Sequence, residues 1–170
     1  MKKHFYPEPT AGLPVLPDGL RQYSGHHDGR GRKIGIVAAR FNIELSGALV
    51  TSAVETLCNH GVAAADIQVV WVPGSFEIPL MLERLDRDHG LDAMIACGVV
   101  LEGKTRHAEL IMHTLTRAFA RISSERNCPV IDAVVSAHTL KQAEERCLSG
   151  GESRGAYAAL AALECATLGL

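Results

Sequence analysis

Residues 93–107, which read AMIACGVVLEGKTRH, decide the fold. The first eight of them form an uninterrupted apolar run, which is typical of a strand buried on both faces of a sheet. The polar residues Glu102, Gly103 and Lys104 end that run. From Thr105 the apolar residues recur with a helical period up to Ser124. An apolar strand that leads directly into a helix predicts a βαβ unit.

The same alternation recurs on both sides of this stretch. We predict three further strands at residues 33–39, 67–72 and 129–135, and helices at 46–58, 76–85, 140–148 and 155–168. Consecutive βαβ units have right-handed crossovers and bury a parallel sheet between their helices. The sequence therefore predicts the α/β class, as a three-layer α/β/α sandwich with a four-stranded parallel sheet and flavodoxin-like winding.

The first 32 residues differ from the rest. They contain Pro7, Pro9, Pro14 and Pro17 and a polar stretch at 24–31, without apolar periodicity. Such a segment predicts an extended N-terminal arm at residues 1–32, followed by a single α/β domain at 33–170. The adjacent His26 and His27 have no further ligand at helical or hairpin spacing, so we predict no metal site.

Composition narrows the class of protein. The chain has 170 residues and a formal net charge of -2, which argues against a general nucleic-acid or membrane-surface binder. The first residues lack the apolar core of a signal peptide, and no apolar run is long enough to span a bilayer. We therefore expect a soluble, cytoplasmic protein. The scattered cysteines are expected to be reduced core residues; they are Cys58, Cys97, Cys128, Cys147 and Cys165.

Polar segments follow each predicted strand. Ligands of open α/β sheets bind in the crevice outside the carboxyl ends of the strands, so these segments are the candidate site. Phe41 and Phe76 would place two aromatic rings at one crevice and suit a flat heteroaromatic ligand, although a loop phenylalanine often caps the core instead. Arg146 and Arg154 are candidates for binding a carboxylate or phosphate, or are solvated cations at helix ends.

The segment after the third strand is the richest in polar groups. Gly98, Gly103, Lys104 and Thr105 have the spacing of a nucleotide P-loop, but Gly98 falls inside the predicted strand, where a P-loop requires a loop. We favour a simpler anion site formed by backbone N–H groups at the start of the helix. His107, in the first helical turn, would exchange protons beside that anion, or is an ordinary surface histidine.

Taken together, these segments resemble the lumazine synthase family of riboflavin biosynthesis. The resemblance covers residues 33 to about 165 and rests on IVAARFN at 36–42, VPGSFEIP at 72–79, GKTRH at 103–107, and the later Glu145-Arg146 and Ser153-Arg154-Gly155. It implies a transferase that condenses 5-amino-6-(D-ribitylamino)uracil with 3,4-dihydroxy-2-butanone 4-phosphate. It also implies no metal or organic cofactor, and a homo-oligomer: a pentamer or a multiple of it, up to an icosahedral shell.

The resemblance also implies roles for individual residues. His107 would transfer protons, while Phe41 stacks on the pyrimidine and Arg146 reaches the phosphate from the adjacent subunit. The other substrate-binding residues that it implies are Asn42, Ser75, Phe76, Glu77, Val99, Val100, Leu101, Lys104, Thr105, Asp132 and Arg154. Two of these depart from the family pattern, because Asp132 replaces an aromatic residue and Arg154 replaces a lysine. The carboxylate of Asp132 would weaken ring binding or bond a ring N–H instead.

An alternative function is a non-catalytic paralogue that binds a flavin or lumazine. Asp132 is its best support. Thr105 and Arg146 argue against it, because a flavin binder needs no phosphate site. The same residues argue against a riboflavin synthase variant on this scaffold, and a shell without chemistry would assemble without binding substrate.

Overall fold

A computed structural model describes residues 6–103 and 105–169 of the chain. Its sheet has four parallel strands, β1 (Ile34–Ala39), β2 (Ile67–Val72), β3 (Ala93–Leu101) and β4 (Val130–Ala137), in the order β2-β1-β3-β4. Ile36 of β1 pairs with Val69 of β2 and with Ile95 of β3, and Gly98 pairs with Val134 of β4. The predicted strands and the predicted fold class are confirmed.

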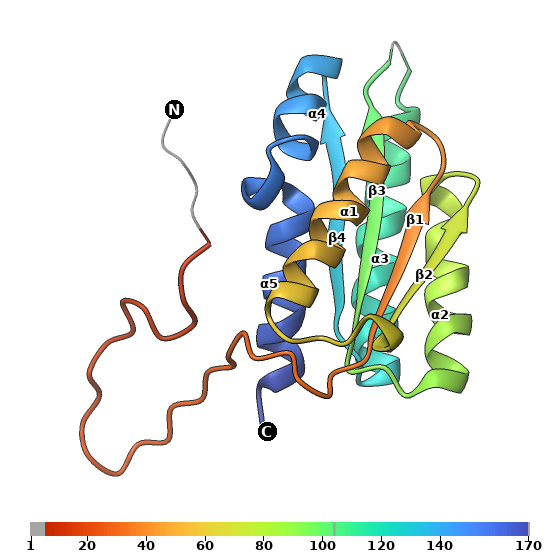
Figure 1. The fold of residues 1–170 in the computed structure, drawn as a ribbon. Helices are drawn as coiled ribbons and strands as arrows, with labels where there is room; N and C mark the ends of the chain where they lie inside the picture. Colours follow the sequence, from red (N-terminus) through yellow and green to blue (C-terminus); the bar gives the residue numbers. More distant parts are fainter. Residues whose placement is uncertain (1–5, 104, 170) are drawn as a thin grey trace.

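Helices cover both faces of this sheet (Figure 1). One face packs against α1 (Ile43–Asn59), α4 (Leu140–Cys147) and α5 (Arg154–Thr167). The other packs against α2 (Ile78–His89) and α3 (His107–Arg126). Short 3-10 turns lie at η1 (Ala64–Asp66), η2 (Ser75–Glu77) and η3 (Gly150–Glu152). None of the helices described has the length and apolarity to cross a membrane.

A close contact joins the start of α5 to α1. A Cβ on Gly155 would lie 2.1 Å from the carbonyl oxygen of Leu49. The buried Ser153 caps α5 by accepting a bond from the amide of Ala156, and its hydroxyl lies 2.5 Å from that of Ser52. Ser52 in turn donates to the carbonyl of Leu49. The two backbones therefore approach as closely as a glycine and two small hydroxyl side chains allow.

We predict that Gly155→Ala lowers the free energy of unfolding by about 2–3 kcal/mol, because the new methyl group meets a backbone atom that side-chain rotation cannot move. Gly47→Ala in α1 is the matched control. A Cβ at Gly47 has no neighbour within 4 Å, so this change should stabilise α1 by up to about 1 kcal/mol. Chemical denaturation measures both. Equal stabilities for the two variants would contradict the packing described.

Residues 6–32 contain no helix or strand and leave the body as a long loop beside α5 (Figure 1). Residues 10–24 are exposed, whereas Gly25 and Gly29 are buried. A Cβ on Gly25 would lie 1.9 Å from the carbonyl oxygen of Glu164, and one on Gly29 would lie 2.4 Å from Val62. The end of the arm is therefore packed against the domain, while its middle is not.

The cysteines are only partly as expected. Cys97, Cys128 and Cys147 are buried, but Cys58 and Cys165 are exposed, so the prediction of a core position is wrong for these two. Cys58 follows the buried Leu57 near the end of α1, and Cys165 lies two residues after the buried Leu163 in α5. A helix turns by about 100° per residue, so an apolar stretch does not bury each of its members.

Candidate active site

A cavity of about 580 Å³ lies at the carboxyl ends of β1 and β3. Its walls come from the loops after β1, β2 and β3 and from the first turn of α3. The site residues predicted from the sequence that line it are Phe41, Asn42, Ser75, Phe76, Val99, Val100, Leu101, Thr105 and His107. We call this space the first cavity.

The loop after β1 is held in place by hydrogen bonds on both sides. The amides of Arg40 and Phe41 donate to the carbonyls of Val72 and Pro73, at 2.8 and 3.0 Å, and so extend the pairing with β2. Asn42 has a left-handed backbone (φ 60°), and its Nδ2 donates to the carbonyl of Val99 in β3 at 3.1 Å. This turn starts α1 three residues earlier than we predicted. Phe41 is left 71% exposed at the cavity, so it does not cap the core.

The loop after β2 approaches β3 closely because Gly98 has no side chain. A Cβ on Gly98 would lie 2.7 Å from the hydroxyl of Ser75, which is buried. Gly98 also pairs within the sheet, so the structure confirms that it does not belong to a P-loop. Phe76, the next residue, lies at the cavity and is 62% exposed.

Glu77 is predicted to bind substrate, but its side chain does not line the first cavity. Its Oε2 accepts a bond of 2.9 Å from the amide of Gly74 and so stabilises the turn that begins η2. The carboxylate still has acceptor capacity for a ligand, because its two oxygens together can accept about four hydrogen bonds.

The start of α3 faces the first cavity. His107 is the first residue of the helix and lines the cavity together with Thr105. Arg106 precedes it and pairs with Glu109, at 3.0 Å. The first amides of a helix have no partner within it, and with the helix dipole they favour an anion. Lys104, the other residue predicted to bind the anion, lies outside the described residues.

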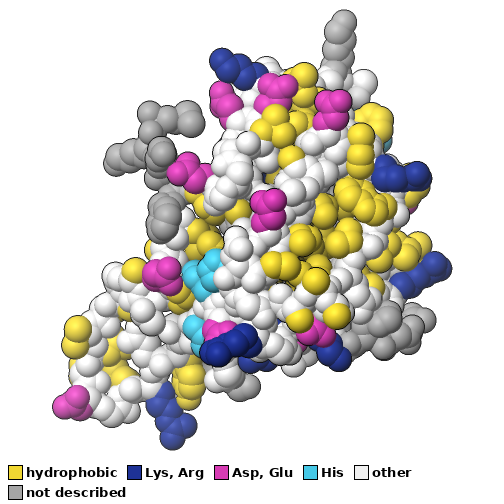
Figure 2. All heavy atoms as spheres, in the orientation of Figure 1, with side chains coloured by type: hydrophobic (Ala, Val, Ile, Leu, Met, Phe, Trp, Pro, Cys, Tyr) yellow, Lys and Arg dark blue, Asp and Glu magenta, His cyan; other side chains and the backbone are white. Residues whose placement is uncertain are grey.

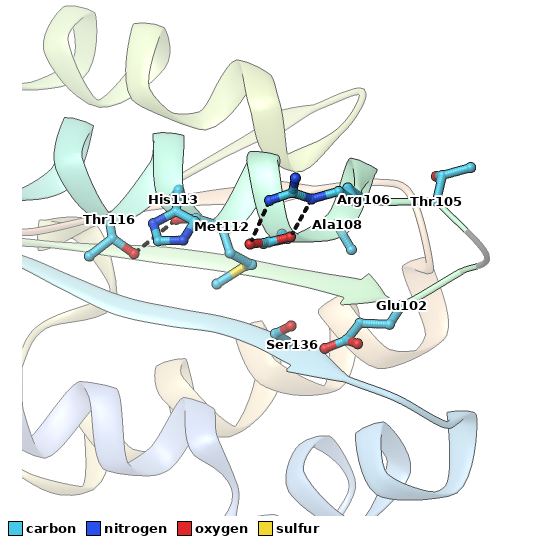
Figure 3. A pocket seen from close by; sticks show the side chains of 9 residues that line it. Glu102, Thr105, Arg106, Ala108, Met112, His113, Thr116 and Ser136 are labelled. Atoms are coloured by element: carbon cyan, nitrogen blue, oxygen red, sulfur yellow. Dashed lines mark hydrogen bonds and ion pairs between the residues drawn. The ribbon is translucent and has the colours of Figure 1, made fainter.

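A second cavity, of about 680 Å³, lies between α3 and the carboxyl ends of β3 and β4. Figure 3 shows Met112 and His113 on α3 and Glu102 and Ser136 at the strand ends. The two cavities share Thr105 and Ala108, so the start of α3 separates them.

Asp132, Arg146 and Arg154 do not line the first cavity. Asp132 lies in β4, where its Oδ1 accepts a bond of 2.9 Å from the amide of Val134, and Arg154 donates to its carbonyl oxygen at 3.0 Å. Arg146 is exposed in the last turn of α4. Burial raises the pKa of Asp132, against the opposing effects of the Val134 amide and the Arg154 charge.

We predict that Asp132→Asn stabilises the protein at neutral pH. The side-chain oxygen of asparagine can still accept the bond from the amide of Val134. The substitution also removes a negative charge that burial disfavours. We expect the thermal midpoint at about pH 7 to rise by a few degrees. The difference should vanish as pH falls through the raised pKa, where aspartic acid is itself neutral. Asp18→Asn in the exposed arm is the control, and a lower midpoint for Asp132→Asn at neutral pH would contradict the prediction.

Two residues that line the first cavity were not predicted from the sequence, Ala108 and Ile111. Ile111 lies one helical turn after His107 and so shares its face of α3, a spacing that would have revealed it. Ala108 follows the predicted His107 and carries no side-chain signal of its own. Gly74, which also lines the cavity, belongs to the polar segment predicted after the second strand.

Among the side chains that the structure describes, no group of three histidines, cysteines or acidic residues could hold a metal ion. The two histidines of the arm have different surroundings. Nδ1 of the exposed His26 accepts a bond from the amide of Asp28, whereas the ring of His27 packs against Tyr6.

The fold and the site define a flavodoxin-like α/β protein with a ligand-sized cavity at the carboxyl ends of its central strands. Residues 31–169 match the family model of 6,7-dimethyl-8-ribityllumazine synthase. The match covers most of the chain, so the protein belongs to the lumazine synthase family, and the resemblance inferred from the sequence is confirmed.

Proposed function

We propose that this protein condenses 5-amino-6-(D-ribitylamino)uracil with 3,4-dihydroxy-2-butanone 4-phosphate to 6,7-dimethyl-8-ribityllumazine. Membership of the lumazine synthase family supports an activity of this kind in riboflavin biosynthesis. The observation that carries the proposal is that one cavity brings together Phe41, Phe76, Thr105 and His107. A reaction that joins a flat ring to a sugar phosphate requires an aromatic surface, an anion site and a group that exchanges protons.

The cavity offers a place for each part of the substrates. The pyrimidine ring stacks on Phe41, and the ribityl chain lies along Ser75, Phe76 and residues 99–101. A hydroxyl of that chain that extends beyond the cavity lining would bond to Glu77. The phosphate binds at Thr105, where the first amides of α3 favour an anion. Asn42 shapes this site through its bond to Val99.

The reaction then needs proton transfers next to the phosphate. The 5-amino group attacks the ketone, and loss of water gives an imine. Removal of the C3 proton expels inorganic phosphate from C4 and leaves an enol, which gains a proton at C4 and loses its O–H proton to become a ketone. Attack of the ribitylamino nitrogen on that ketone closes the ring with loss of a second water. His107, beside Thr105, takes and returns the protons in these steps. Holding both substrates in one cavity contributes by orientation.

We further propose that each site is completed by a second copy of the chain. Arg146, Arg154 and Asp132 lie away from the first cavity of their own chain. The surface also carries apolar side chains over α1 and β2 (Figure 2). In β2, Val69 and Trp71 are 38% and 41% exposed. Exposed apolar surface of this kind favours association. A pentamer, or a multiple of it, would place Arg146 of one chain near the phosphate held by the next.

Within this assembly, residues 33–170 form one catalytic domain and residues 1–32 an arm. None of the cysteines in the described part of the chain is joined in a disulfide. Cysteines without disulfides support a place in the cytoplasm, because disulfides are typical of secreted chains.

The first test is turnover by the purified protein with both substrates, followed by the absorbance of the lumazine. We expect activity in the wild type and a fall of about 10²–10⁴-fold in kcat for His107→Ala, the usual contribution of a general acid–base residue. His113→Ala, exposed on the same helix outside the first cavity, is the matched control. An unchanged rate for His107→Ala removes His107 from its role. Absence of turnover with tight binding of a flavin overturns the proposed function.

Mixing two inactive variants tests the shared site. We expect His107→Ala and Arg146→Ala to be weakly active alone. Co-assembly in equal amounts should restore activity at about a quarter of the sites, those that combine an intact His107 from one chain with an intact Arg146 from its neighbour. A mixture no more active than its components would show that both residues act within one chain.

A further inference from the structure

The arm folds back on itself at His27. The His27 ring lies 5.8 Å from that of Tyr6 and, edge-on, 5.8 Å from that of His60 at the end of α1. Tyr6 also lies 6.1 Å from Tyr157 of α5. We call Tyr6, Glu8, His27, His60, Tyr157 and Glu164 the His27 cluster. The exposed residues 10–24 form a loop that this cluster closes. In Figure 2, histidine side chains lie where the arm joins the body.

The side chain of His27 is only 8% exposed, so each of its ring nitrogens needs a partner. Nδ1 faces Oε2 of Glu8 at 3.6 Å, but Nε2 is buried and has no hydrogen-bond partner among the described residues. A neutral ring with its proton on Nδ1 leaves only a lone pair at Nε2. Protonation adds a buried N–H donor with no acceptor, which is costly.

Some of the groups around His27 raise its pKa and others lower it. Burial lowers the pKa of His27; the His60 and His26 rings lower it further, while the carboxylates of Glu8 and Glu164 raise it. Glu8 is 76% exposed, so solvent screens its attraction. Glu164 already accepts a bond of 2.8 Å from Tyr6, whose pKa burial and this bond raise to about 12. Tyr6 therefore stays a donor, and the neutral form of His27 is favoured.

We propose that His27 is a pH-sensitive clasp that closes the loop of residues 6–24 onto α1 and α5 while its ring is neutral and opens that loop when the ring is protonated. The arm is fully docked above the ordinary histidine pKa of 6.5 and is released as pH falls through the lower value of the docked state. Release detaches Tyr6 and Glu8 and exposes Tyr157.

Release stops at residue 25, because the rest of the arm is held without His27. The hydroxyl of Thr167 accepts from the amide of His26 at 2.8 Å. The carbonyls of His26, at 2.8 Å, and Leu163, at 2.7 Å, both lie within reach of the hydroxyl proton. The amide of Gly29 donates to the carbonyl of His60 at 2.7 Å. Gly25 packs directly on the backbone of Glu164. None of these contacts changes its charge with pH.

The chain contains three tyrosines, which suits it to hydroxyl-radical labelling read by mass spectrometry. Tyr6 and Tyr157 report on the clasp, and Tyr23, which is 52% exposed in the free part of the loop, is an internal reference. Met94, which is 0% exposed in β3, reports on global unfolding. On lowering the pH from about 7.5 to about 5.5, we expect labelling of Tyr6 and Tyr157 to rise severalfold with Tyr23 and Met94 unchanged.

Two variants assign the effect to His27. His27→Phe keeps a ring but cannot be protonated, so Tyr6 and Tyr157 should stay protected at both pH values. His26→Asn removes the neighbouring titratable group, keeps an acceptor for the Asp28 amide, and should behave as the wild type. The proposal is overturned if the wild type shows no rise, if His27→Phe shows the same rise, or if His27→Phe is labelled at both pH values, which would mean that polar contacts of the imidazole hold the arm.

Discussion

All four strands run in one direction, and this constraint places the site. Because the strands are parallel, their carboxyl ends all lie at the same end of the sheet, and each connection has to cross back over one face to the other end. From β1 the chain passes over one face through α1 to β2, and from β3 it passes over the other face through α3 to β4. Because β1 and β3 are neighbours, their loops leave in opposite directions and open a crevice between them. The first cavity occupies that crevice.

Two local features then narrow the crevice to the size of a ligand. Gly98 lets η2 lie directly on β3, so Ser75 and Phe76 enter the cavity from the β2 side. Asn42 adopts a left-handed turn and bonds to Val99, which brings Phe41 to the same opening. Asparagine tolerates this conformation better than most residues do, and glycine alone has no Cβ to displace Ser75.

Most of the fold and of the candidate site can be predicted from the sequence, because these features depend on local sequence patterns and on the parallel topology. The remaining features depend on contacts in the folded chain. The buried strands are local apolar runs, and polar residues that follow them are positioned by the parallel topology, so Phe41, Ser75, Thr105 and His107 could be found. The start of α1 depends on the backbone of Asn42, which only its contact with β3 explains. The capping bond of Glu77 and the exposure of Cys58 and Cys165 also depend on the folded chain. The structure of a single chain shows where Asp132, Arg146 and Arg154 lie, but it places none of them at the first cavity.

Asp132 and Arg154 lie together at the open edge of the sheet. β4 is an edge strand, and the Asp132 carbonyl and the Val134 amide point away from β3. Arg154 and the Asp132 carboxylate occupy these two groups, which blocks the addition of another strand there. Arg154 opens α5 between Ser153 and Gly155, the residues that hold α5 against α1. The packing of α5 against α1 thus positions the guanidinium of Arg154 at the edge strand β4. A chain that docked on β4 would meet charged side chains there instead of unpaired backbone groups.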